Sequence, residues 1–261
     1  AVRFEVDHRG EEGQFILTGS SVPASMENVS HTGTGRFSWL TMRPMSLFES
    51  GESNGEVSLN NLFNNPQKIS AINNLTLNDI AFLCCRGGWP RALWNETPES
   101  QLEIANDLFY QTCHRDISRI DDTERNPLFA ERILRSYSRN ICTLAQSKTL
   151  YGDVTAASEI SKQTYYSYIE ALQKLFIIED VPAWCPSIRS KEAMRAGVKR
   201  NLIDPSIAVA ALGLTPEYFN TDFKTLGFLF ESLCIRDLKI YSSKMRGEMS
   251  YYHDRYGLEA D

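Results

Sequence analysis

The sequence predicts a mixed fold, in which an α/β part is followed by mainly helical segments. Two short apolar runs, 14–18 and 36–42, have the length and the flanking polar loops of buried β-strands. From Thr76 onward the apolar residues recur at helical spacing instead. Residues 148–184 combine both patterns, because two helical runs lead into a strand-like run. The fold class is therefore α/β plus α.

The composition is that of a globular protein and not that of a dedicated nucleic-acid binder. The chain has 261 residues, of which 42% are hydrophobic and 23% are charged, as in globular proteins with room for more than one hydrophobic core. A net charge of -6 argues against a surface that is basic throughout, which is the usual property of a dedicated nucleic-acid binder. A local basic patch is still compatible with this balance.

The cysteines indicate a reducing compartment. They lie in apolar surroundings without any CxxC spacing, which favours buried reduced thiols over a zinc site or a disulfide framework. No apolar run approaches the ~18–20 residues that a membrane helix needs, so a cytoplasmic location without a membrane partner is expected. The six cysteines are Cys84, Cys85, Cys113, Cys142, Cys185 and Cys234.

Glycines and polar loops mark the boundaries of the predicted N-terminal elements. The first residues have the pattern of the last turns of an amphipathic helix. The run 14–18 lies between Gly13 and Gly19 and is predicted to be a strand. Residues 22–35 are small and polar and predict a surface loop, and 36–42 alternate as a second strand.

The middle of the chain is predicted to be helical. A helix beginning near Thr76 is stopped by Gly87-Gly88-Trp89-Pro90, and further helices are predicted over 99–120 and 127–147. A short helix at 154–160 then precedes Ser161, which can cap a helix over 162–175. Residues 176–181 change to strand periodicity before Pro182. This order is typical of a winged helix-turn-helix.

The last third predicts both strands and helices. Residues 199–203 are a strand candidate, and Asp204-Pro205 provides an N-cap and an N1 proline for a helix over 206–212. An apolar helix is predicted over 226–241. Two strands of a hairpin, 249–252 and 258–261, close the chain.

Six short motifs follow one another along the chain and together resemble a family of predicted bacterial and archaeal ATPases. Those proteins carry an AAA-type P-loop domain, a winged helix, and a C-terminal domain of unknown function related to restriction endonucleases. The resemblance spans essentially the whole chain. The motifs are Phe-Ile-Leu-Thr-Gly-Ser-Ser (15–21), Gly-Arg (35–36), Arg-Pro-Met-Ser-Leu-Phe-Glu (43–49), Arg-Gly-Gly-Trp-Pro (86–90), Gly-Phe-Leu-Phe-Glu (227–231) and Gly-Leu-Glu-Ala-Asp (257–261).

The resemblance also implies a division of the chain and a missing part. It implies the C-terminal part of an ATPase sheet at 1–60, a helical lid at 61–115, a helical region with a winged helix at 116–185, and the start of an endonuclease-like domain at 186–261. The chain contains no GxxxxGK[ST] motif, the loop that holds β- and γ-phosphates. Both ends are expected to be cut, so ATP and Mg²⁺ are implied for the parent protein rather than for this piece alone.

Three residues are implied as catalytic by the resemblance. Thr18 and Ser20 end the first strand, at the position where a hydroxyl beside the γ-phosphate orients the attacking water. The alternative is that they only close the strand and satisfy loop backbone. Arg36 is a candidate arginine finger, or else a surface salt-bridge residue, and Arg43 is a weaker candidate for the same role.

The winged helix suggests contact with DNA. The residues in a position to make it are Lys162, Gln163, Tyr165 and Tyr166, at the start of the second helix. Phosphate contacts depend on Lys and Arg, and the local charge of this helix is near zero. A packing or protein-contact role is therefore the alternative, and it is the one that the charge favours.

The acidic residues of the last third suggest a metal site. Endonuclease-like cores hold Mg²⁺ with a helix glutamate, a strand aspartate and a later Glu-x-Lys, because carboxylate oxygens are hard ligands. Glu231 would be the helix acid, and Asp261 the strand acid, with Asp254 nearby and the Glu-x-Lys beyond residue 261. The alternative is that Glu231 forms a salt bridge and Asp261 is solvated.

The function predicted from these features is coupling of nucleotide state to a C-terminal effector domain. The chain is then a fragment of an ATP-binding and ATP-hydrolysing AAA-type protein, inactive alone. One alternative is a DNA-binding winged-helix and metal-nuclease module, with ATP as regulator. Another is a non-catalytic scaffold that binds a protein partner.

Overall fold

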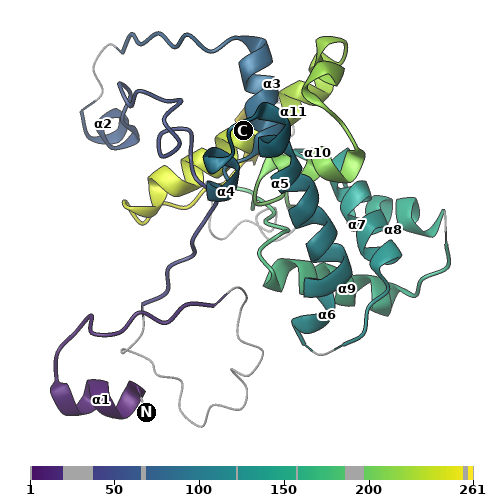
Figure 1. Ribbon diagram of the computed structural model, residues 1–261, viewed down its shortest axis with the longest axis horizontal. Coiled ribbons are helices and arrows are strands. Elements are labelled where there is room, and N and C mark those ends of the chain that lie inside the picture. The colour runs from purple at the N-terminus through teal and green to yellow at the C-terminus, as the bar shows by residue number, and fades with distance from the viewer. Residues whose placement is uncertain are drawn as a thin grey trace.

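Helices dominate the computed structural model, which describes residues 2–19, 38–65, 69–121, 123–156, 158–185, 197–254 and 258–260. The predicted mixture of α and β structure is confirmed at this coarse level, with far more helix than strand. Figure 1 shows most of the helices gathered into one body, with the N-terminal segment to one side. We call residues 77–254 the helical body.

The N-terminal segment contains little regular structure. A helix, α1 (Val2–Arg9), agrees with the prediction, and α2 (Leu59–Asn64) follows much later, capped by Ser58. The predicted strand at 14–18 is wrong, and so is the described part of the strand predicted at 36–42, because both lack ladder partners here. Strands are stable only when neighbours satisfy their backbone and cover their apolar side chains.

Several helices of the body begin after a residue whose side chain caps them. Thr76 and Asp79 form a reciprocal capping box at the first helix, which ends at Gly87 with φ 73°. The helices are α3 (Leu77–Arg86), α4 (Pro90–Trp94), α5 (Pro98–Gln111), the π-helix η2 (Thr112–Asp116), α6 (Ile117–Arg119), α7 (Pro127–Arg139), α8 (Ser147–Thr155), α9 (Lys162–Lys174), α10 (Pro205–Leu212), the 3₁₀ helix η3 (Pro216–Asn220) and α11 (Phe223–Ser243).

Two predicted helices differ from the observed ones. The helix predicted over 127–147 stops at Arg139, where the chain turns so that the Cys142 amide donates to the Arg200 carbonyl. The helix predicted over 154–160 is α8, which lies earlier because Leu150 and Val154 are the residues that it buries. By contrast, α9 and its Ser161 cap are confirmed.

The predicted strand runs at 176–181 and 199–203 lie side by side and are joined by isolated bridges. Ile178 bridges Leu202 and Val181 bridges Lys199 in antiparallel fashion, and Ala183 bridges Tyr251 in parallel. The C-terminal hairpin is also confirmed in part, because β1 (Tyr252–His253) pairs antiparallel with β2 (Glu259–Ala260). These bridges join the segment after α9 to residues 199–202 and to Tyr251.

A single hydrophobic cluster holds the body together. It combines buried side chains from α3, α7, α9, α10 and α11, so the predicted lid, winged-helix and C-terminal parts share one core. Helix α10 lies at the centre and packs against α3, α5, α7 and α11 (Figure 1). None of the helices in the described ranges is both long enough and apolar enough to cross a membrane.

Candidate functional site

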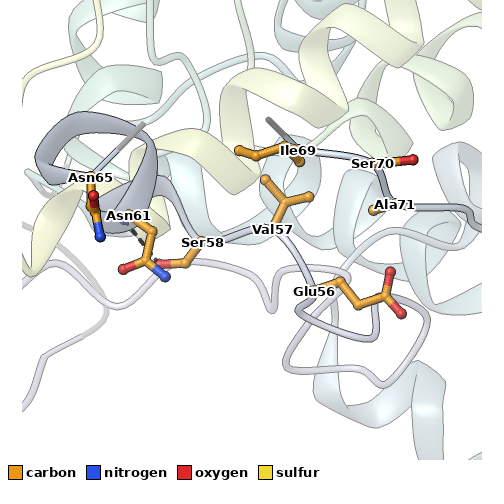
Figure 2. A pocket seen from close by; sticks show the side chains of 8 residues that line it. All are labelled: Glu56, Val57, Ser58, Asn61, Asn65, Ile69, Ser70 and Ala71. Atoms are coloured by element: carbon orange, nitrogen blue, oxygen red, sulfur yellow. Dashed lines mark hydrogen bonds between the residues drawn. The ribbon is translucent and has the colours of Figure 1, made fainter. Parts of the chain in front are cut away.

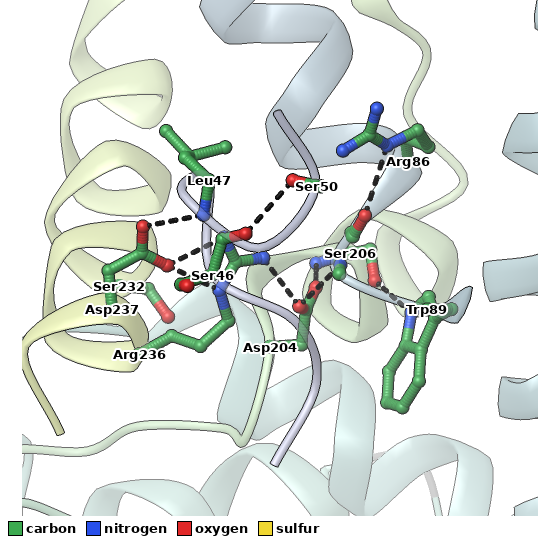
Figure 3. Close-up of polar contacts among 12 residues, drawn as sticks. Ser46, Leu47, Ser50, Arg86, Trp89, Asp204, Ser206, Ser232, Arg236 and Asp237 are labelled. Atoms are coloured by element: carbon green, nitrogen blue, oxygen red, sulfur yellow. Dashed lines mark hydrogen bonds and ion pairs between the residues drawn. The ribbon is translucent and has the colours of Figure 1, made fainter. Parts of the chain in front are cut away.

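A buried cluster of polar side chains lies where four distant segments meet. Figure 3 shows side chains from the loop after α3, the start of α10, the middle of α11 and residues 46–50 pointing toward one another. Asp204, Arg236 and Asp237 are its charged members, and each is at most 7% exposed. Buried charges are retained only when they are paired and hydrogen-bonded. We call these three residues the charged centre.

Asp204 organises one side of the charged centre. Its Oδ1 accepts from the Ser206 amide at 2.9 Å, which makes Asp204 the N-cap of α10. Its Oδ2 accepts from the Gly88 amide at 3.0 Å and from Arg236 Nη1 at 2.9 Å. The same carboxylate therefore joins three elements that lie far apart in the sequence.

Arg236 lies between two carboxylates. Its Nε donates to Asp237 Oδ1 at 2.8 Å, and its Nη2 lies 2.7 Å from the same oxygen. Burial by itself lowers the pKa of Arg236, but the charges of Asp204 and Asp237 outweigh it and raise that pKa above its ordinary value. Arg236 is therefore always charged, and it neutralises one of two buried negative charges.

The loop between α3 and α4 fits closely around this centre. Gly87 has a positive φ of 73°, and a Cβ there would overlap Ser206 and Asp204. A Cβ at Gly88 would overlap the backbone of Met45. Trp89 Nε1 donates to the Ser206 hydroxyl at 2.8 Å. Both glycines of the Arg-Gly-Gly-Trp-Pro motif are thus required by close packing, Gly87 against side chains and Gly88 against backbone.

Residues 43–53 dock on the charged centre, and we call them the strap. The Met45 amide donates to the Gly88 carbonyl at 2.6 Å, and the Leu47 amide donates to Asp237 Oδ2 at 2.9 Å. Ser46 is fully buried, and Leu47 packs against the core of the body. Figure 3 shows Leu47 and Ser46 directly beside Asp237.

Two ion pairs hold the ends of the strap. Arg43 Nη1 pairs with the Glu179 carboxylate, which Lys239 Nζ also approaches at 3.2 Å. At the other end, Glu52 Oε1 accepts from Arg86 Nη1 at 2.5 Å. Burial lowers the pKa of Lys239, and the charge of Glu179 offsets part of that effect. The strap is therefore fixed to the body at its start, middle and end.

The geometry of the charged centre suits mechanical positioning rather than catalysis. Asp204, Ser206 and Arg236 are at most 2% exposed, so substrate cannot reach them in this conformation. The glycine loop 87–88 is also unsuited to hold a phosphate. It faces the Asp204 carboxylate, which would repel a phosphate, and its Gly88 amide already donates to that carboxylate.

The residues implied as catalytic are not brought together in the part of the chain that can be described. Thr18 is exposed and lies outside any strand, whereas Ser20 and Arg36 lie outside the described residues. Arg43, the weaker arginine-finger candidate, pairs with Glu179 in the strap. The roles of Thr18, Ser20 and Arg36 stay predictions.

The structure divides the predicted DNA-contact residues into two groups. Lys162, Gln163 and Tyr166 are exposed at the start of α9. Tyr165 is only 1% exposed and packs edge-on against Tyr151, so it belongs to the core and not to a DNA-contacting surface. Burial raises the pKa of Tyr165 to about 12.

The predicted metal ligands have other contacts where they are described. Glu231 Oε1 accepts from Lys199 Nζ at 2.7 Å, which agrees with the salt-bridge alternative. Asp254 Oδ1 accepts from the Leu258 amide at 2.9 Å. Asp261 lies outside the described residues. Within the described ranges no group of three or more His, Cys, Asp or Glu side chains is placed to hold a metal ion.

The cysteines agree with the prediction of reduced thiols. All six are thiols and not half-cystines, and Cys84, Cys85, Cys113 and Cys142 are buried. Burial raises the pKa of Cys85 to about 12 and that of Cys234 to about 11, which makes these thiols poor nucleophiles at neutral pH.

Two open hollows lie on the surface away from the charged centre. The larger, about 420 Å³, is bordered by residues 56–58, Asn61, Asn65 and residues 69–71 (Figure 2). A second, of about 280 Å³, lies along α11 between Phe230 and Met249. Neither brings together convergent charged groups that would fix a ligand.

Sequence reasoning missed most of the charged centre. Asp204 was identified only as a helix cap, and Arg236 and Asp237 were hidden in a helix predicted from its apolar pattern. The available signal is the Arg-Asp pair at 236–237 within the run Leu-Cys-Ile-Arg-Asp-Leu, because charges inside an apolar helix need buried partners.

Comparison with known proteins gives one match. The family model described as "Domain of unknown function (DUF8612)" matches residues 77–218, which is more than half of the chain. This range begins at α3 and includes the glycine loop, α9 and α10, but ends before α11. No curated protein and no solved structure matches the chain.

Proposed function

The chain belongs to the DUF8612 family, a domain of unknown function, and we propose that its helical body is the coupling module of an ATP-hydrolysing protein. In this role the body receives the conformational state of the segment that precedes it and passes it to α11 and the C-terminal hairpin. ATP and Mg²⁺ belong to a P-loop core and not to the described residues. The resemblance of the six motifs supports the nucleotide part of this proposal.

The observation that carries the proposal is the docking of the strap. The strap directly follows the segment in which Thr18, Ser20 and Arg36 lie, and it contacts three different parts of the body. Leu47 reaches Asp237 on α11, Met45 reaches Gly88, and Arg43 reaches Glu179 in the strand run after α9. A displacement of the strap therefore changes the contacts of all three parts together.

The charged centre connects the strap to the core through a series of contacts. Asp237 accepts from the Leu47 amide on one side and pairs with Arg236 on the other. Arg236 in turn holds Asp204, the N-cap of α10. Since α10 packs at the middle of the core, a change at Leu47 reaches the core through three adjacent buried groups.

The test is ATP turnover by the full-length protein that contains the P-loop. The double variant Arg43→Gln/Glu52→Gln removes both end pairs of the strap without touching the charged centre. We expect it to change the rate of ATP hydrolysis by roughly fivefold or more, the scale of typical coupling energies. Glu170→Gln, which removes the exposed pair with Lys174, is the matched control.

Two outcomes would count against the proposal. A full-length protein that neither binds nor hydrolyses ATP would remove its nucleotide part. Turnover that is the same in the wild type, the double variant and the Glu170→Gln control would remove the coupling part. Unfolding of each variant by urea, measured alongside, separates a change in coupling from a loss of folded protein.

DNA binding is the second candidate, because the start of α9 is exposed and carries Lys162 and Gln163. Gel shift at two salt concentrations tests it, since a complex driven by phosphate contacts must weaken steeply with salt. Lys162→Gln should weaken such binding, whereas Lys174→Gln at the far end of the same helix should not. DNA binding that is unchanged in both variants would show that this surface does not contact DNA.

A further inference from the structure

The strap is organised by its own contacts. Ser46 and Glu49 bond reciprocally, because both the amide and the hydroxyl of Ser46 donate to the Glu49 carboxylate at 2.8 Å. The Ser53 amide donates to the Leu47 carbonyl at 2.9 Å, which closes the turn. A peptide that keeps its bound shape through internal bonds loses less entropy when it binds. The strap therefore resembles a preorganised ligand.

The groups that receive the strap keep other partners if it leaves. Asp237 still has Arg236, and the Glu179 carboxylate still has Lys239. Arg86 still donates from Nε to the Gly87 carbonyl. After removal of the strap, each of these three charges therefore still has a hydrogen bond or an ion pair. Loss of a buried partner is costly when it leaves a charge with neither.

The chain on both sides of the strap is free to follow it. Trp39, Leu40 and Met42, which precede it, are 73% to 87% exposed. Residues 54–57, which follow it, are exposed and contain Gly55. Neither flank adds buried apolar surface that would oppose opening.

From these contacts we infer that the helical body carries a preformed binding site for a turn peptide, and that the strap is its detachable occupant. The site recognises an arginine for Glu179, two backbone amides for Gly88 and Asp237, a leucine for the apolar surface beside α11, and a carboxylate for Arg86. This inference rests on the coupling role proposed above and names its moving part, but its test needs no nucleotide.

Hydrogen exchange of the chain itself measures detachment. If the strap opens locally, the amides of Met45 and Leu47 exchange at least about 100-fold faster than those of Leu229 and Leu233 in α11, which require global unfolding. Arg43→Gln should accelerate the two strap amides by a further threefold or so, the scale of one ion pair. The exchange rates of the two strap amides are compared directly between variants, because local opening does not depend on the free energy of global unfolding.

A matched variant and a peptide complete the test. Glu170→Gln, which breaks an exposed pair on α9, should leave the exchange rates of the strap amides unchanged. A synthetic peptide covering residues 41–55, added at millimolar concentration to compete with the tethered strap, should accelerate exchange of the strap amides, and the same peptide with Arg43→Gln and Glu52→Gln should do so less.

Two results would overturn the inference. Strap amides that exchange at the same rate as those of α11 would show that the strap is an integral part of the core. Strap amides that respond identically to the peptide and to its double variant would show that the body has no site for this sequence. If the strap detaches but ATP turnover does not depend on it, this inference stands and the proposed function is wrong.

Discussion

Residues 10–42 and the helical body have similarly apolar stretches but very different structures. In the first region Ile16, Leu40 and Met42 are 85% to 89% exposed, and no regular element forms in its described part. In the body, Leu134, Leu172 and Leu229 are completely buried. The difference shows that an apolar run produces structure only when the same chain supplies a surface to cover it.

The strap marks the border between these two regions. Trp39, Leu40 and Met42 lie in solvent, whereas from Pro44 onward the chain is held by buried carboxylates and carbonyls of the body.

Replacing Arg236 with Met should have the largest effect, because it leaves Asp204 and Asp237 buried without their cation. We expect the free energy of unfolding to fall by about 3–5 kcal/mol, measured by urea denaturation. Arg9→Met removes an exposed pair in α1 and should change it by less than about 0.5 kcal/mol. A loss below 1 kcal/mol for Arg236→Met would contradict the role of the charged centre.

Truncation of leucine compares the two regions directly. Leu229→Ala should cost about 2–5 kcal/mol, because the side chain is completely buried between helices. Leu40→Ala should cost less than about 0.5 kcal/mol, since that side chain is already in solvent. Equal losses for the two variants, read from the same urea curves, would mean that the N-terminal segment packs on the body in solution.

Adding one methyl group at two glycines separates docking of the strap from helix stability. Gly88→Ala places a Cβ against the Met45 backbone and should cost about 1–3 kcal/mol as the strap is pushed away. Gly227→Ala, in the open face of α11, meets no neighbour and should stabilise the chain by about 1 kcal/mol. Thermal unfolding that changes in the same direction for both would contradict this assignment.

Acid should weaken one contact of the body by a small amount. The hydrogen bonds from Arg125 lower the pKa of Asp121 to about 2, below its unfolded value of 3.8. Because the folded pKa is the lower one, this contribution is complete above pH 4 and is lost as the pH falls toward 2. Asp121→Asn should remove that part of the acid dependence, measured by unfolding at several pH values. An unchanged acid profile would show that the pair is solvent-screened.

The local structure of the body could be predicted because its signals are local. Thr76, Ser161 and Asp204 each precede an apolar helical run, and each is observed to cap its helix. A cap needs only the next three residues of the chain, so no tertiary information is required. The strand at 14–18 could not be judged in this way, because a strand depends on partners that the sequence pattern does not supply.

The candidate site could be predicted only in fragments. Glycines 87 and 88 signalled the end of a helix, but their second property, close approach to Ser206 and Met45, depends on residues far along the chain. Tyr165 is a candidate for DNA contact from its place on a recognition helix, although the charge of that helix favours a packing role, and in the structure it faces the core. Helical spacing gives a face, and only packing decides which face is inside.

The sequence by itself determined where the helices that follow Thr76, Ser161 and Asp204 begin, and that Asp204 is an N-cap, because both depend on neighbouring residues. Only the tertiary structure decided that the same Asp204 carboxylate also holds Gly88 and Arg236, residues 116 and 32 positions away. The physical reason is that a buried charge must be neutralised by whichever partners the fold brings within hydrogen-bond distance. Those partners are set by how helices pack and not by their spacing in the sequence.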